Sequence, residues 1–198
     1  MKSGYRFYRV CYRLARVFIS VFYRIRVTGK ENIPEGAAMV CANHSSMIDP
    51  FLTAFAFGLK YQMHIIAKAE LFRIPVISPI LKKLGMISVD RGVMDASAVK
   101  AALRYLKDGE KVVIFPEGTR VHEDDAISAK AGAVKLAERT GVPVLPFFLP
   151  RKKPLFRRVA LVIGEPYYIE RQPDKRTSND YALLSGELME KINSLGRK

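Results

Sequence analysis

The feature that most constrains the fold of this chain is a repeated alternation between short apolar runs rich in β-branched residues and longer segments with helical periodicity. We expect strands at Met39–Ala42, Met63–Ala67, Met86–Val89, Lys111–Phe115, Pro143–Leu149 and Val159–Ile163. We expect helices at Pro50–Leu59, Pro79–Leu84, Met94–Lys107, Ser128–Arg139 and Ser178–Leu195. Alternating strands and helices predict an α/β fold with a largely parallel central sheet flanked by helices, because parallel neighbours need crossover connections.

The composition limits what else the chain can be. With 198 residues, 49% of them hydrophobic and 26% charged, it suits one packed domain with an appendage and excludes a disordered or low-complexity chain. Cys11 and Cys41 are too few for a disulfide framework, and no CxxC pair or Cys/His cluster has the spacing of zinc ligands. We therefore expect no metal site and a reducing compartment.

The N-terminal segment carries an unusual share of the positive charge. The chain has a formal net charge of +14, and residues 1–30 contain Lys and Arg but no acidic residue. A helix over residues 5–23 would align one basic stripe, made of Arg6, Arg9, Arg13 and Arg16. The opposite face would carry Phe7, Cys11, Leu14, Phe18 and Val21, with Tyr5, Tyr8, Tyr12 and Tyr23 on its flanks.

This pattern is typical of a helix that lies on an anionic phospholipid membrane, with tyrosines at the level of the headgroups. We therefore expect residues 1–26 to form an amphipathic membrane-association arm and residues 27–198 to form the main domain. The alternative is a helix that only covers the core and keeps its arginines in water. A nucleic-acid partner is not expected, because the chain shows no RNP, helix-turn-helix or zinc-finger pattern.

No apolar run reaches the roughly 18 to 20 residues that a membrane-spanning helix needs, so we do not expect the chain to cross a bilayer. We expect a peripheral or monotopic protein on the cytoplasmic face of the membrane. Residues 71–81 are apolar but contain two prolines and precede Lys82 and Lys83, which suits either a membrane-dipping loop or a buried packing loop. A later basic stretch fits anionic lipid, an acidic carrier protein, coenzyme A phosphates or a solvated loop. It consists of Arg151, Lys152, Lys153, Arg157 and Arg158 around Leu155 and Phe156.

The loop after the first expected strand contains a histidine and a carboxylate five positions apart, His44 and Asp49. On a regular helix the two side chains would lie about 140° apart, so contact requires a turn at His44 and a helix that begins near Asp49. Pro50 favours that arrangement, with Asp49 at the N-cap. A carboxylate at Nδ1 would leave Nε2 to take a proton from a hydroxyl group. The plainer alternative is a helix cap beside an ordinary loop histidine.

Two more loops follow expected strands and should meet the first at the same edge of the sheet. In Phe115-Pro116-Glu117-Gly118-Thr119-Arg120, the glycine lets a ligand approach the backbone, and the arginine offers a planar fork for phosphate or carboxylate. The strand at Met86–Val89 is followed by Arg91. The other histidines are expected in the core (His64) and at the surface (His122).

Four blocks in this order resemble those of the glycerolipid acyltransferases: NHSSMID at 43–49, GMISVDR at 85–91, FPEGTR at 115–120 and VPVLP at 142–146. The KAELF segment at 68–72 is similar to the one these enzymes carry between the first two blocks. The resemblance covers about half of the chain directly. It implies a catalytic pair in which His44 is the general base and Asp49 orients it.

The resemblance further implies an acceptor site formed by Lys68, Arg91, Glu117, Gly118, Thr119 and Arg120, with the cations binding a phosphate. The implied reaction moves a fatty acyl group from an acyl carrier protein or coenzyme A thioester to the sn-2 hydroxyl of lysophosphatidate, giving phosphatidate. The thioester is a co-substrate and no cofactor is expected. Other acceptors, namely another lysophospholipid or glycerol 3-phosphate, and a non-catalytic lipid-binding role remain open.

The same chemistry requires donors for a tetrahedral oxyanion, and we expect them among the backbone N–H groups near His44. Ser45 and Ser46 invite a serine-nucleophile mechanism, but neither lies in a GxSxG elbow. We therefore expect direct attack of the acceptor hydroxyl on the thioester.

Overall fold

The computed structural model of the chain describes residues 2–90, 95–121, 129–172 and 174–197. Within these residues, one sheet has the strand order β1-β7-β6-β2-β5-β3-β4. All neighbouring strands are parallel except β6 and β7. The strands are β1 (Arg24–Thr28), β2 (Ala38–Ala42), β3 (Met63–Lys68), β4 (Ile87–Val89), β5 (Lys111–Ile114), β6 (Val144–Phe148) and β7 (Arg158–Ile163). The predicted α/β fold with a largely parallel sheet is confirmed.

The helices also follow the predicted pattern. They are α1 (Lys2–Phe22), α2 (Asp49–Phe57), α3 (Ile77–Lys83), α4 (Ala96–Lys107), α5 (Gly132–Thr140) and α6 (Ser178–Ser194), with short 3-10 helices η1 (Lys30–Asn32), η2 (Ala69–Arg73) and η3 (Leu195–Arg197). The expected starts of two helices, Met94 and Ser128, lie outside the described residues, as does His122.

Strand β1 was not predicted from the sequence, and the boundary expected between residues 26 and 27 falls inside this strand. The sequence RIRVT alternates charged and apolar residues, and β1 is an edge strand that pairs only with β7 among the described residues. An edge strand that is exposed on alternate residues lacks the continuous apolar run by which the other strands were recognised.

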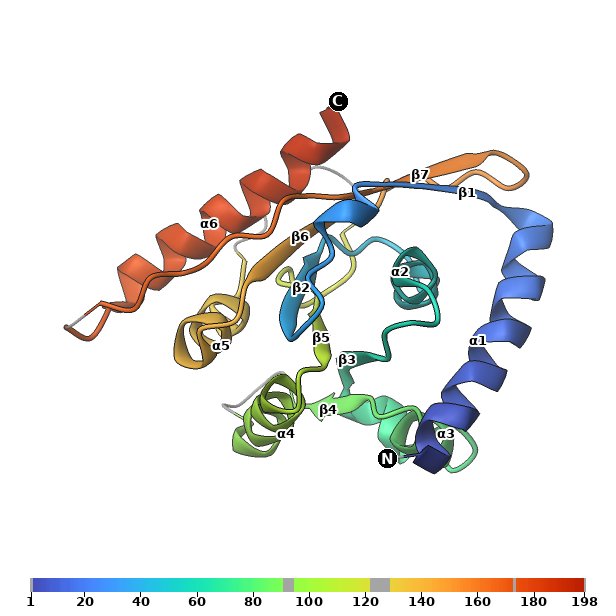
Figure 1. Cartoon of the computed structure of the whole chain (residues 1–198), viewed down its shortest axis with the longest axis horizontal. Helices are drawn as coiled ribbons and strands as arrows, with labels where there is room; N and C mark the ends of the chain where they lie inside the picture. Colours follow the sequence, from blue (N-terminus) through green and yellow to red (C-terminus); the bar gives the residue numbers. More distant parts are fainter. Residues whose placement is uncertain (1, 91–94, 122–128, 173, 198) are drawn as a thin grey trace.

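Helices cover both faces of the sheet. Figure 1 shows α2 on one side of the strands with α1 outside it, and α4, α5 and α6 on the other side. Val40, Leu52 and Phe147 belong to the core under α2, whereas Met39, Val112 and Leu188 belong to the core under α4–α6. Because both faces are covered, all five residues of β2 are buried.

Helix α1 packs on the protein through its tyrosines. Tyr8 and Tyr12 are only 6% and 5% exposed, and the Tyr12 ring meets Phe55 of α2 edge-on at 5.1 Å between centroids. The Tyr5 hydroxyl donates to the Leu59 carbonyl. The expectation that the tyrosines lie at headgroup level is therefore wrong for Tyr8 and Tyr12. Burial of both rings is favoured by their large apolar area.

A different face of α1 points away from the protein. Its exposed apolar residues are Val10, Leu14, Val17, Phe18 and Val21, each at least half exposed. Residues 71–81 are not buried either. The 3-10 helix η2 and helix α3 contain no buried residue, and Val76, which lies between them, is 74% exposed. The interpretation of residues 71–81 as a buried packing loop is therefore wrong. No helix in the described part of the chain is long and apolar enough to cross a membrane.

Candidate active site

The imidazole of His44 contacts the carboxylate of Asp49, with 3.0 Å between Nδ1 and Oδ2. His44 follows β2, and the chain turns before α2 begins at Asp49, which brings the two side chains together across five positions. The imidazole also stacks on Phe115, with ring centroids 4.3 Å apart. With Nδ1–H donated to the carboxylate, Nε2 is the nitrogen that can accept a proton.

Asp49 does not cap α2 as expected. Asp49 is itself the first helical residue, and its side chain turns back into the preceding loop. There Oδ2 accepts hydrogen bonds from the backbone N–H groups of Ser45 and Ser46, both at 2.7 Å. The carboxylate thus organises the whole turn around His44, and this is a stronger constraint than a helix cap because three donors converge on one oxygen.

The charge of Asp49 is stabilised although its side chain is fully buried. Burial acts to raise the pKa of Asp49, but the hydrogen bond with His44, the nearby Lys153 ammonium and the Ser45 amide together lower it below its ordinary value. The carboxylate therefore stays ionised at neutral pH, as a partner for an imidazolium must.

Glu117 connects the turn after β5 to His44. Its Oε2 accepts the backbone N–H of His44 at 2.6 Å, and its Oε1 pairs with Arg151 Nη2 at 2.9 Å. The Glu117 side chain is only 1% exposed. A second hydrogen bond joins the same loop to His44, because the N–H of Val121 donates to the His44 carbonyl at 2.8 Å. The structure thus gives Glu117 a clear structural role at the site.

Between the hydrogen bonds at Glu117 and Val121 lie Gly118, Thr119 and Arg120. The backbone of these three residues therefore stays close to His44. Thr119 and Arg120 are exposed, as a ligand contact requires. Gly118 has φ of +67°, and a Cβ atom there would lie 2.7 Å from Cε of Lys130. A glycine is needed both for that backbone conformation and for the close approach of Lys130, a residue that the sequence analysis did not single out.

Lys68 ends β3 at the same edge of the sheet, where its Nζ pairs with Glu70 at 2.8 Å. Both side chains are about half exposed. Arg91, expected in the acceptor site, lies outside the described residues.

The structure adds two cations that sequence reasoning placed on a surface loop, Arg151 and Lys153. Arg151 pairs with Glu117 and donates from Nη1 to the Val121 carbonyl at 3.0 Å. Lys153 lies 2.8 Å from Asp49 Oδ1, and its side chain is only 3% exposed. The interpretation of these two residues as lipid-facing or solvated is therefore wrong. Asn43 contributes to their placement, because its side chain makes two hydrogen bonds with the backbone of Leu149.

No local signal in the sequence marks Arg151 and Lys153 as site residues, since they follow His44 by more than a hundred positions. The signal that could have found them is the order of strands, because β6 lies beside β2 and its following residues reach the loop after β2.

The backbone amides around His44 are already engaged. The N–H of His44 donates to Glu117, and those of Ser45 and Ser46 donate to Asp49. These three N–H groups are therefore not available to stabilise the oxyanion, contrary to expectation. The Ser45 hydroxyl donates its proton to the Arg151 carbonyl and accepts from Lys153, whose ammonium is paired with Asp49. In this arrangement no group acts as a base toward the Ser45 hydroxyl, as a serine nucleophile would require.

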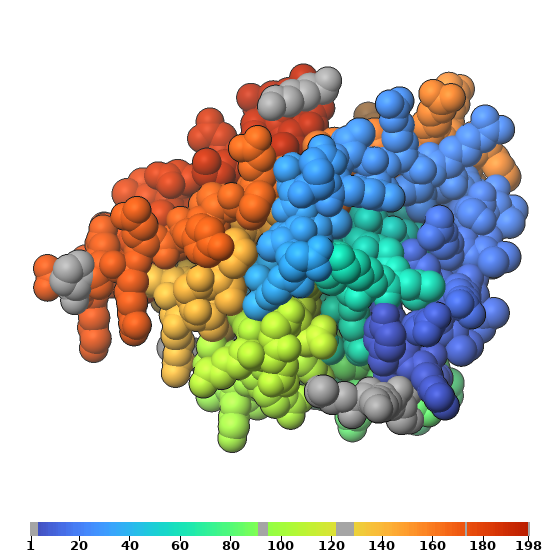
Figure 2. Space-filling view, viewed as in Figure 1, coloured from blue at the N-terminus to red at the C-terminus, as the bar shows by residue number. Residues whose placement is uncertain are grey.

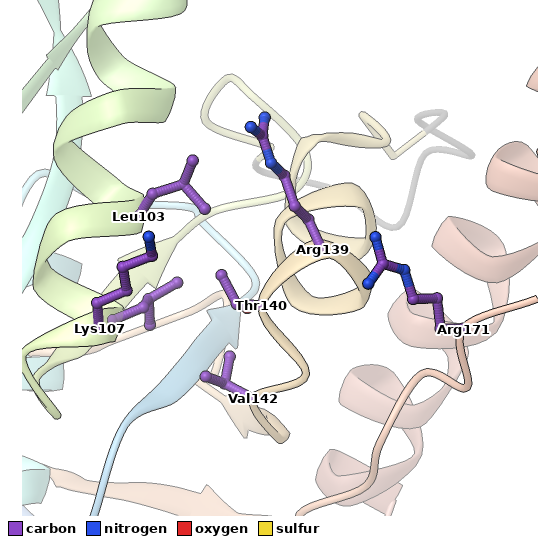
Figure 3. Close-up of a pocket in the computed structure, with 7 residues that line it drawn as sticks. Leu103, Lys107, Arg139, Thr140, Val142 and Arg171 are labelled. Atoms are coloured by element: carbon purple, nitrogen blue, oxygen red, sulfur yellow. The ribbon is translucent and has the colours of Figure 1, made fainter.

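A separate cavity of about 320 Å³ lies between α4 and α5 (Figure 3). It is lined by Leu103, Leu106, Lys107, Arg139, Thr140, Val142 and Arg171. Val142 leads into β6 whereas His44 follows β2, and these strands are parallel neighbours. The cavity therefore opens at the opposite edge of the sheet and does not belong to the site.

Known proteins are similar to this chain over most of its length. A family model described as Acyltransferase matches residues 24–149. The 1-acyl-sn-glycerol-3-phosphate acyltransferase of Bacillus subtilis is 34% identical over 197 residues, which cover 96% of this chain and 98% of that one. The enzyme of the same name from Borreliella burgdorferi is 31% identical over 169 residues, 83% of this chain and 66% of that one.

Among solved structures, the 1-acyl-sn-glycerophosphate (LPA) acyltransferase PlsC of Thermotoga maritima has the same fold, with a TM-score of 0.68 and 29% sequence identity. The match covers 99% of this chain and 78% of that chain. The family match includes His44, Asp49 and the turn at Glu117, the residues that carried the resemblance in the sequence. The chain belongs to the acyltransferase family.

Proposed function

We propose that this protein transfers a fatty acyl group from an acyl thioester to the sn-2 hydroxyl of lysophosphatidate, giving phosphatidate. The observation that carries the proposal is the His44–Asp49 contact at 3.0 Å in a chain that matches a 1-acyl-sn-glycerol-3-phosphate acyltransferase along nearly its whole length. The acyl donor is an acyl carrier protein or coenzyme A thioester.

In the proposed mechanism, His44 Nε2 removes the proton of the acceptor hydroxyl as its oxygen attacks the thioester carbonyl. Asp49 stabilises the imidazolium through Nδ1. The tetrahedral intermediate then collapses, the C–S bond breaks, and the leaving thiolate takes the proton from His44. Because the acceptor attacks directly, this route needs no acyl-enzyme intermediate.

We assign the phosphate of the acceptor to the exposed cations around the Gly118 turn. Arg120 immediately precedes Val121, whose N–H donates to the His44 carbonyl, and the Lys130 side chain runs over Gly118. A phosphomonoester carries nearly two negative charges at neutral pH, so two or more cations are expected around it. Lys68 and Arg91 remain proposed members of this site. Glu117, with both oxygens engaged in the loop, is proposed to position it.

The protein is proposed to work at the surface of an anionic membrane, on its cytoplasmic face. The outward face of α1 carries Leu14 and Phe18, each 67% exposed, beside the arginine stripe. The tip of the β6–β7 connection extends this surface, since Phe156 is 66% exposed and its N–H donates to the Phe22 carbonyl. Figure 2 shows this orange tip and the blue helix along the same rim of the molecule.

The test is phosphatidate formation by the purified protein in mixed micelles of lysophosphatidate and acyl thioester. His44→Ala should lower kcat on the order of 10²- to 10⁴-fold, because a positioned general base is lost. Asp49→Asn should lower it as well, whereas Asp180→Asn, which changes a capping residue of α6, should leave it unchanged.

Full turnover by His44→Ala would overturn the mechanism. Failure of the wild-type protein to acylate lysophosphatidate with either donor class would overturn the proposed substrate, and product from glycerol 3-phosphate or another lysophospholipid would then identify the acceptor.

A further inference from the structure

A buried lysine contacts the oxygen of Asp49 that faces away from His44. Lys153 Nζ lies 2.8 Å from Asp49 Oδ1 and 2.7 Å from the Ser45 hydroxyl oxygen. Its side chain is 3% exposed, and that of Asp49 is fully buried. Lysine is rarely buried to this degree unless it is paired, because an ammonium loses its hydration on burial. The contact is therefore a specific feature of the site.

The carboxylate of Asp49 divides its contacts between its two oxygens. Oδ2 receives the His44 ring and the amides of Ser45 and Ser46, and Oδ1 faces Lys153. Among the described residues, the ionisable groups in contact with this carboxylate are thus His44 from the loop after β2 and Lys153 from the β6–β7 connection. Glu117 faces the main chain of His44, and its charge is paired with Arg151.

We propose that Lys153 is a positioning residue that balances the charge of Asp49 and so keeps His44 unprotonated before substrate binds. The inference rests on the proposed function, in which His44 must start as a neutral base. A buried carboxylate with no other counter-ion would attract a proton to the imidazole beside it. With Lys153 in place, Asp49 and Lys153 carry no net charge together, while Asp49 still stabilises the imidazolium that forms during the reaction.

A purely structural role makes a different prediction. If Lys153 only fastened the β6–β7 connection to the active-site turn, its loss would lower stability and slow the reaction by the same factor at every pH. The balancing role instead moves the acid limb of the pH–rate profile, because it changes the pH at which His44 takes up a proton.

The experiment compares Lys153→Met, Lys153→Gln and Lys153→Arg with Lys152→Met, an exposed neighbour in the same connection. In the full-length protein, rates are measured against pH, and the midpoint of the His44 ring titration is measured by NMR. The Met and Gln variants should shift both to higher pH and lose on the order of tenfold in rate near pH 7. In both measurements, Lys153→Arg should stay closer to the wild type than either neutral variant. Lys152→Met should behave like the wild type.

Unchanged midpoints in the folded Met and Gln variants would overturn the proposal, even where their rates fell. Gln retains a polar side chain with a hydrogen-bond donor but carries no charge, so it serves if Met prevents folding. The titration of His44 is independent of turnover, so an inactive wild-type protein would overturn the proposed reaction and still leave the effect of Lys153 measurable.

Discussion

The backbone N–H of His44 donates to the carboxylate of Glu117 at 2.6 Å, although the two residues lie 73 positions apart in the chain. This bond joins the loop after β2 to the turn after β5, and Arg151 completes the connection from the β6–β7 side. Three loops that follow three neighbouring strands are thus fastened to one another at the residue proposed to carry the chemistry.

Replacing Glu117 with Gln should therefore impair both stability and turnover. An amide in place of Oε1 or Oε2 would point a donor at Arg151 or at His44, which costs about 1–3 kcal/mol in the free energy of unfolding. The rate should fall with it, because the His44 loop loses a tie. Glu138→Gln is the matched control, since Glu138 pairs with Arg176 at 2.8 Å outside the site. Denaturant unfolding and phosphatidate assays measure the two effects. Equal activity of the two variants would contradict this prediction.

Asn43→Ala should destabilise the protein more than a single lost surface contact would. The fully buried Asn43 amide donates to the Leu149 carbonyl at 2.6 Å and accepts its N–H at 2.8 Å. Alanine leaves both backbone groups without these partners, at a cost on the order of 3 kcal/mol. Asn32→Ala, which removes one partly buried bond to Ile163, should cost less. Urea denaturation ranks the two variants, and the reverse order would show that the Asn43–Leu149 pair does not hold these loops.

Replacing both Leu14 and Phe18 with Ser should weaken binding to vesicles on the order of tenfold or more, because two exposed apolar side chains of α1 no longer enter the lipid. Leu183→Ser is the control, since Leu183 is equally exposed, at 67%, on the distant helix α6. Sedimentation with vesicles of phosphatidylglycerol and phosphatidylcholine measures binding. Unaltered binding of the double variant would exclude this face as the membrane contact.

Replacing the four arginines of the basic stripe with Gln should weaken binding to anionic vesicles and leave binding to neutral vesicles nearly unchanged. These are Arg6, Arg9, Arg13 and Arg16. Each cation near an anionic surface contributes about 1 kcal/mol, and this contribution disappears with the lipid charge. The same sedimentation assay is run at two lipid compositions. A loss that is independent of lipid charge would indicate that the substitutions disturb α1 itself.

The ionisation of Lys111 should contribute to the pH dependence of stability. Lys111 is 1% exposed, and its ammonium donates to the carbonyls of Pro34 and Gly36. Burial lowers the pKa of Lys111 to about 8 from an ordinary value of 10.5. Between these values the unfolded chain binds more protons than the folded one, so this residue makes stability rise with pH, by at most about 1.4 kcal/mol per pH unit. Lys111→Met should remove that rise in urea unfolding between pH 8 and pH 10.5, and a rise of the same size in Lys111→Met would contradict the assignment.

Local pattern was sufficient for most of the fold. Strands such as β2 and β5 are buried on both faces, so their residues form apolar runs that sequence alone reveals. The edge strand β1 failed this test because Arg24 and Arg26 interrupt it. For α1, the sequence identified a basic stripe and an apolar face, but the tyrosine face proved to be the one that packs on α2.

The sequence by itself determined most of the strands and helices, the His44–Asp49 pair and the family, because each is read from short runs of neighbouring residues. Only the tertiary structure decided that Glu117 ties His44, that Arg151 pairs with Glu117 and that Lys153 lies buried against Asp49. The physical reason is that buried charges are paired by whichever strands become neighbours, and a cationic loop residue has the same local pattern whether it meets solvent or a distant carboxylate.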